Sequence, residues 1–357
     1  MEKKRIEWVD LAKFFCMMAV MADHSAMMTD ALDGFVEPWY LNMFSFAAGY
    51  VYLHRRGFGH FFQKKVRQLF VPWLIFSSLT IALAHVLSFN EHEPLLVELG
   101  KNLLQIQYYG SEMWYVAALF VAFLPFYFFI DAYERSALPH GRRELLFCLT
   151  AFALSLGSAW FSNFAPRDLF PWCRPEVPVT LPWHLQYAFQ AMFYMFLGYL
   201  FRNRWEALFD RKNGWGRAAL LLALHPLMVF LFPGLIPFFG PRFRVLYLYL
   251  CAFVALAALT SLCKLLGANR HMLYVGRNTV IYYGLHGKAE SLLQTLLQRL
   301  LPDLWNTVRW VIGDWRVIAA LLIAWAVSWL LVPAAWIINR YFPWMLGRKR
   351  SGSSSPM

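Results

Sequence analysis

Apolar residues occur along the chain in long runs that short polar segments separate. We expect ten of these runs to cross a membrane, because one helix needs roughly 17–25 mostly apolar residues to span a bilayer. The runs cover residues 8–28, 38–54, 69–88, 113–130, 145–162, 183–201, 217–232, 243–266, 276–298 and 314–338. The pattern predicts an all-α polytopic membrane protein with about ten transmembrane helices.

Positively charged residues gather in every second connecting segment. With the N-terminus in the cytoplasm, the inner segments hold 23 Lys and Arg residues, including two at their edges, and the outer segments hold eight. The inner segments are 1–7, 55–68, 131–144, 202–216, 264–275 and 339–357. Since basic residues are retained on the cytoplasmic side, both termini are expected there. We expect one integral membrane domain over residues 1–346 and a disordered, basic and serine-rich cytoplasmic tail over 347–357.

Composition supports a protein that is largely surrounded by lipid. Hydrophobic residues make up 59% of the chain, charged residues 15%, and the mean hydropathy is +0.44. A soluble domain carries about a quarter charged residues. The net charge of +12 is therefore attributed to basic cytoplasmic segments and not to a nucleic-acid partner. The five cysteines form no CxxC pair, so neither a disulfide framework nor a metal site is expected.

Three of the ionisable residues in the first apolar run are candidates for function, because such groups are costly inside a membrane. Asp10 and Lys13 are three residues apart and can pair on one helix face. Lys13 and His24 are eleven apart, close to three full turns, and share a face. About 21 Å of helix rise separates Asp10 from His24, which places His24 in the outer half of the membrane. The alternative is that all three are ordinary residues of helix ends.

A second candidate group lies in the cytoplasmic segment before the third run. Lys64, Lys65 and Arg67 form a basic cluster there. The tendency of basic residues to remain inside explains such a cluster by itself. Alternatively, the cluster holds the phosphates of a cytoplasmic ligand, since Lys and Arg bind phosphate oxygens. The residues alone leave both explanations open.

Two further segments carry polar residues at the ends of apolar runs. Glu112 precedes the fourth run, where it can act functionally or simply favour the positive end of the helix dipole. Trp114 and Tyr115 follow it and are typical of an aromatic belt at the membrane surface. Arg277, Asn278 and His286, by contrast, lie in or beside the ninth run. We expect that helix to face a wet cavity, unless these residues merely mark the helix end.

Several of these segments together resemble the membrane-bound acyltransferase 3 family. The resemblance extends over roughly residues 5–338. The most specific match is the opening signature, in which an arginine, an acidic residue and a basic residue precede a histidine at the end of the first helix. The matching segments are Arg5-Ile-Glu-Trp-Val-Asp10-Leu-Ala-Lys13 with His24, Met43-Phe-Ser-Phe-Ala-Ala-Gly-Tyr50, Met113-Trp-Tyr-Val and Gly276-Arg-Asn-Thr followed by Leu285-His286.

The resemblance implies a ten-helix enzyme of the bacterial cytoplasmic (inner) membrane. It implies transfer of an acyl group, usually acetyl, from cytoplasmic acyl-CoA to a hydroxyl of a cell-surface or lipid-linked glycan. His24 corresponds to the essential histidine of the family and Lys13 to its basic partner. Lys64-x-x-Arg67 corresponds imperfectly to an Arg-x-x-Arg motif that precedes the third helix.

The roles expected from this resemblance follow the chemistry of acyl transfer. His24 is expected to be the general base, and acetyl-CoA the donor, bound through Lys64, Lys65 and Arg67. From their membrane position alone, and not from the resemblance, Arg277 or Asn278 is expected to stabilise the oxyanion. The competing hypothesis is a transporter or flippase for a lipid-linked glycan, because the same buried charges can relay protons.

Overall fold

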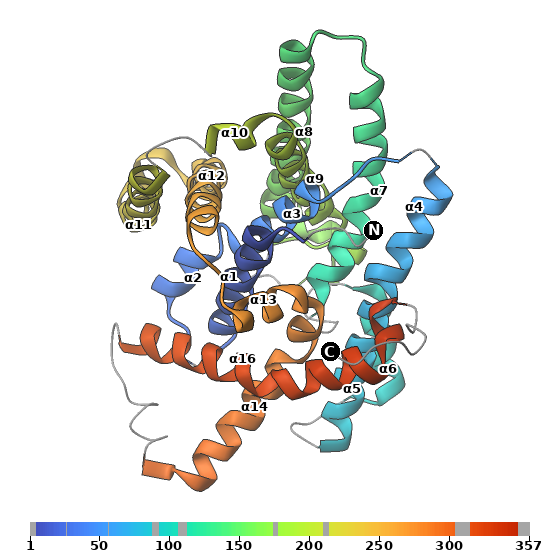
Figure 1. The fold of residues 1–357 in the computed structure, drawn as a ribbon, viewed down its shortest axis with the longest axis vertical. Helices are drawn as coiled ribbons and strands as arrows, with labels where there is room; N and C mark the ends of the chain where they lie inside the picture. Colours follow the sequence, from blue (N-terminus) through green and yellow to red (C-terminus); the bar gives the residue numbers. More distant parts are fainter. Residues whose placement is uncertain are drawn as a thin grey trace.

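The computed structural model describes most of the chain, and every secondary-structure element in its described residues is helical (Figure 1). This agrees with the predicted all-α class. The described residues are 5–25, 27–55, 57–87, 93–105, 113–173, 178–209, 214–303 and 315–348, without the side chains of 232–239 and 241.

The helices that form the body of the molecule surround the N-terminal helix α1, which lies at the centre of the view in Figure 1. They are α1 (Glu7–Asp23), α2 (Asp30–Val36), α3 (Tyr40–Tyr50), α4 (Phe58–Lys65), α5 (Val71–Leu87), α6 (Leu95–Leu104), α7 (Trp114–Arg135), α8 (His140–Phe164), α9 (Leu185–Leu200), α10 (Glu206–Phe209), α11 (Gly214–Phe239), α12 (Pro241–Leu265), α13 (Arg270–Arg277), α14 (Thr279–Leu300) and α16 (Trp315–Tyr341).

Six helices in the described residues are long and apolar enough to cross a membrane. They are Phe58–Val86, Trp114–Arg135, His140–Phe164, Gly214–Leu231, Arg242–Leu265 and Trp315–Tyr341. Each coincides with one of the ten predicted runs. Together they identify a multi-pass membrane protein.

The other four predicted runs also form helices, but these are shorter or more polar. At 1.5 Å per residue, α1 with 17 residues and α9 with 16 fall short of a hydrocarbon core of about 30 Å. Both are mainly buried against neighbouring helices. The third, α3, has 11 residues, and α14 carries several polar side chains. The count of ten spans and the cytoplasmic termini therefore stay predictions.

The basic segment before the third run is helical and is continuous with the helix of that run. One helix begins at Phe58 and continues through a π-helical turn, Val66–Phe70, into α5. The Gln-Lys-Lys-Val-Arg sequence consists largely of good helix formers, so nothing stops the helix before Pro72. Since proline has no amide hydrogen to donate, the wider π turn next to it accommodates the missing hydrogen bond.

Glycines allow the central helices to approach each other at backbone contact. A Cβ atom on Gly49 would overlap the carbonyl oxygen of Met195, and one on Gly198 would overlap that of Phe46. These two glycines join α3 to α9. Likewise, a Cβ on Gly276 would overlap the carbonyl oxygen of Asp10. Small residues at helix contacts are the usual means of close association inside membranes.

Candidate active site

At the N-terminal end of α1, Asp10 is the centre of an ion-pair cluster. Its side chain is buried, and Lys13 Nζ lies 2.7 Å from Oδ1, as the three-residue spacing predicts. Arg277 Nε lies 3.3 Å from Oδ2, and a terminal nitrogen of Arg5 lies 3.9 Å from the same oxygen. The backbone contact of Gly276 with α1 brings Arg277 into this position.

At the C-terminal end of α1, the exposed ring of His24 stacks on the ring of His286. The ring centroids are 5.3 Å apart and the planes are inclined by 29°. His286 belongs to α14 and is 1% exposed, and its Nδ1 lies 2.9 Å from the carbonyl oxygen of Tyr283. A carbonyl can only accept, so Nδ1 of His286 carries a hydrogen. The two histidines from distant parts of the sequence thus form one pair.

The oxyanion role predicted for Arg277 or Asn278 does not fit this geometry. Arg277 contacts Asp10, which is about 21 Å of helix rise from His24. Asn278 donates to the carbonyl oxygen of Tyr274 and accepts a 2.8 Å hydrogen bond from Asn339. Sequence position alone could not reveal that both residues lie at the opposite end of α1.

A group of carboxylates begins at Asp23, the residue before His24, and continues with Asp33 and Glu37 on the segment that follows α1. The hydroxyl of Tyr40 donates a 3.0 Å hydrogen bond to Asp23, which is buried. Burial, followed by the nearby charges of Glu37 and Asp23, raises the pKa of Asp33 to about 6. Burial likewise raises the pKa of Glu37. This side of the site therefore offers hydrogen-bond acceptors to a ligand that carries hydroxyl groups.

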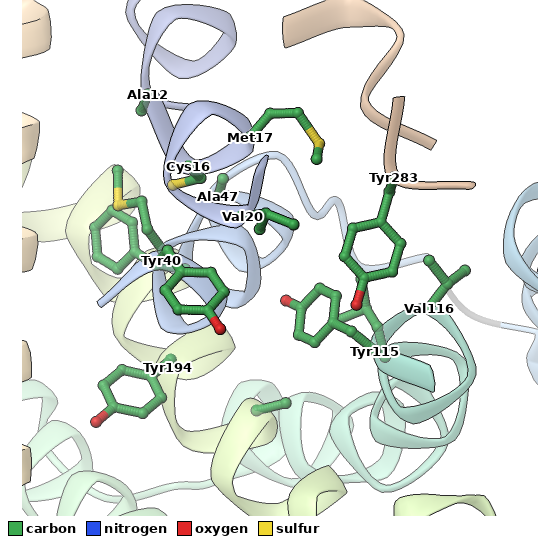
Figure 2. Close-up of a cluster of buried hydrophobic side chains, with 14 of the residues drawn as sticks. Ala12, Cys16, Met17, Val20, Tyr40, Ala47, Tyr115, Val116, Tyr194 and Tyr283 are labelled. Atoms are coloured by element: carbon green, nitrogen blue, oxygen red, sulfur yellow. The ribbon is translucent and has the colours of Figure 1, made fainter. Parts of the chain in front are cut away.

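Aromatic rings lead away from the histidine pair towards the start of α7. The ring of Tyr283 lies 5.9 Å from that of His286 and 6.3 Å from that of Tyr115, and Figure 2 shows the two tyrosines converging beside α1. Tyr115 lies 5.9 Å from Tyr187. Since Tyr115 is 4% exposed and donates to the carbonyl oxygen of Leu41, it is a core residue and not a belt residue. Tyr283 was missed in the sequence, although it lies one helical turn before His286.

The three side chains of the predicted basic cluster do not point the same way. Lys64 and Arg67 are exposed. Lys65 turns instead towards α7, where its Nζ lies 3.2 Å from the centroid of the Phe123 ring. This cation–π contact holds the ammonium group of Lys65 within the protein.

A pocket of about 240 Å³ lies between the helix that carries Lys64 and Arg67 and the N-terminal end of α14. Its lining residues are Gln68, Pro72, Arg277, Asn278, Val280, Ile281, Leu346, Gly347 and Arg348. Arg348 was not among the predicted site residues, because one more basic residue in a predicted cytoplasmic tail carries no signal of its own. Of the predicted site residues, Glu112 lies outside the described residues.

Comparison with known proteins identifies the class of this protein. A family model described as an acyltransferase domain matches residues 6–340. The chain therefore belongs to the acyltransferase 3 family of membrane acyltransferases. Searches of curated proteins and of solved structures found no match.

Proposed function

We propose that this protein transfers an acetyl group from cytoplasmic acetyl-CoA to a hydroxyl of a cell-surface or lipid-linked glycan. The observation that carries the proposal is the arrangement on α1. One end of this buried helix carries the cationic cluster around Asp10, and the other end carries the exposed His24. An anionic donor and a neutral acceptor can thus approach opposite ends of the same helix.

The basic end of α1 suits the nucleotide part of the donor. CoA carries several phosphates, which Lys and Arg side chains bind through charge-assisted hydrogen bonds. Lys64 and Arg67 are exposed, and Arg277 lines a pocket nearby. With the nucleotide held there, the long pantetheine arm can extend along α1 and bring the thioester to His24. Lys13 and Asp10 shape this path.

In the reaction, His24 acts as the general base. Its imidazole takes the proton of the acceptor hydroxyl while the oxygen attacks the thioester carbonyl. The tetrahedral intermediate collapses with cleavage of the carbon–sulfur bond. The proton then passes from His24 to the departing CoA thiolate, so that the products are an acetyl ester and CoA thiol. His286 holds the ring of His24 by stacking on it.

The surroundings of His24 suit a sugar acceptor. Asp23, Asp33 and Glu37 are acceptors for sugar hydroxyls. Tyr283 packs against His286, and Tyr115 packs against Tyr283, so these buried rings support the histidine pair.

The test is a mass comparison of surface and lipid-linked glycans from cells that carry the wild-type protein, His24→Ala or no protein. We expect a mass difference of one acetyl group in the wild type, lost in His24→Ala at equal protein abundance. The matched control is His60→Ala, because His60 is also exposed but lies on α4, and it should retain the product. A well-expressed His24→Ala variant with normal acetylation would contradict the general-base role. A change in the amount of glycan outside, without a change in its mass, would favour the transporter hypothesis.

A further inference from the structure

The cationic cluster around Asp10 carries more positive charge than its acidic partner can neutralise. Lys13, Arg277 and Arg5 all lie within 4.0 Å of Asp10. Among the described residues, Asp10 is the one carboxylate that forms ion pairs with these three. Arg348 is a fourth cation nearby: its side chain is exposed, and partial desolvation together with the charge of Arg5 lowers the pKa of its guanidinium. Like charges that lie close together disfavour one another, and a second anion beside them would relieve the repulsion that Asp10 alone leaves.

The pocket described above opens into this group of cations. Two arginines, Arg277 and Arg348, line it together with the polar residues Gln68 and Asn278. Its volume of about 240 Å³ is below the roughly 300–1,000 Å³ of sites that enclose a whole small ligand. The pocket therefore fits one charged end of a larger molecule.

The C-terminal segment forms one wall of the pocket and is held in place by specific contacts. It turns through a short helix, Pro343–Leu346, and then through Gly347, whose φ of +64° favours glycine. A Cβ on Gly347 would overlap the carbonyl oxygen of Arg67, so the segment rests on the π-helical turn. This contact explains why these residues lie against the basic helix.

A chain of hydrogen bonds orients Arg348. Its guanidinium donates to Asn339 over 2.7 Å, and Asn339 donates to Asn278 over 2.8 Å. Asn278 in turn donates to the carbonyl oxygen of Tyr274. An arginine has five N–H donors, and the bond to Asn339 uses one of its terminal nitrogens. The remaining donors are available to a ligand in the pocket.

We propose that this pocket binds a phosphate group of the acyl donor, with Arg277 and Arg348 as its ligands and residues 343–348 as its wall. The proposal rests on the proposed function and refines it, because it locates one phosphate contact beyond the Lys64–Arg67 segment. Arginine suits the task, since its planar fork pairs with two phosphate oxygens at once. An anionic lipid headgroup has the same phosphate chemistry, and the experiment distinguishes the two sources.

The test measures the affinity of purified full-length protein for CoA by isothermal titration calorimetry in neutral detergent. Arg348→Gln should weaken CoA binding about tenfold, the usual effect of losing a hydrogen bond to a charged group. Arg348→Lys should be intermediate, because it keeps the charge but loses the fork. The matched control is Arg340→Gln, which removes an exposed charge from the end of the preceding helix α16 and should leave the affinity unchanged.

The possible outcomes separate the two proposals. Unchanged CoA affinity in a folded Arg348→Gln variant would overturn the phosphate pocket and leave acyl transfer intact. A wild-type protein that does not bind CoA would contradict the proposed function, and the pocket assignment would fall with it. If Arg348→Gln does not fold, Arg348→Lys with wild-type affinity overturns the pocket equally well.

A second arm tests the lipid source. The titration is repeated in nanodiscs of phosphatidylcholine and in nanodiscs that contain phosphatidylglycerol. We expect the effect of Arg348→Gln to be the same in both. If phosphatidylglycerol weakens CoA binding to the wild type but not to Arg348→Gln, the pocket holds a lipid headgroup and the donor assignment is overturned.

Discussion

At the residue scale, the proposed reaction depends on two pairs of side chains at opposite ends of α1. Asp10 and Lys13 pair within one helix turn, and their spacing alone predicted this contact. The pairing of His24 with His286 joins residues that are far apart in the sequence. A single sequence can mark both histidines as unusual at membrane depth, but only the fold brings their rings together.

We predict that His286→Ala lowers kcat about tenfold or more and leaves the KM for acetyl-CoA nearly unchanged. The reason is that His286 orients the ring of His24 and does not contact the nucleotide end of the donor. A poorly oriented general base loses part of its usual contribution of about 10²–10⁴-fold to the rate. The measurement is steady-state release of CoA thiol by the purified protein with an acceptor glycan.

His286→Gln serves as the conservative comparison, because an amide preserves polarity but cannot reproduce the stacked imidazole. It should remain impaired. If both variants instead raise KM and lower kcat by the same factor, the substitutions cause a general structural defect. An unchanged pH dependence of kcat in a fully active His286→Ala variant would remove His286 from the account.

At the element scale, backbone contact between helices determines where the site residues lie. The contact of Gly276 with Asp10 holds the short helix α13 against α1, and this places Arg277 at Asp10. Gly347 likewise holds the C-terminal segment against the π-helical turn Val66–Phe70. In both cases the glycine lets two elements approach more closely than a side chain allows.

We predict that Gly276→Ala destabilises the protein by about 1–3 kcal/mol, the usual cost of overpacking a filled contact. It should also reduce acyl transfer, because α13 must shift and Arg277 then leaves Asp10. The measurement is the thermal midpoint in detergent together with CoA release. The control is Gly267→Ala, since Gly267 has open space around it. A Gly276→Ala variant with wild-type stability and activity would contradict the close contact.

Much of the element pattern was predictable from hydrophobic runs, but some boundaries and contacts were not. Each of the ten predicted runs has a helix in the structure, because long apolar segments have few alternatives in a membrane. The apolar runs did not show that the basic segment before the third run extends its helix back to Phe58, although lysine, arginine and glutamine are good helix formers. The position of Arg277 was not predictable, since its partner Asp10 lies 267 residues away.

At the scale of the whole molecule, segments predicted on the cytoplasmic side lie together. Arg5, Arg277 and Arg348 come from three separate inner segments and gather at one end of α1. Gly347 contacts a fourth inner segment, 55–68, at the carbonyl oxygen of Arg67. The cytoplasmic position of this end rests on the charge bias between loops. The proposed reaction requires that the donor approach from this side and the acceptor from the other.

The most direct test of this account uses sealed, right-side-out membrane vesicles that contain the protein and its endogenous glycans. Acetyl-CoA labelled in the acetyl group is supplied either inside the vesicles or outside. We predict that glycan on the outer surface becomes labelled only when the donor is inside, and that His24→Ala abolishes this labelling. Labelling from donor supplied outside, with none from donor inside, would contradict the transfer route along α1.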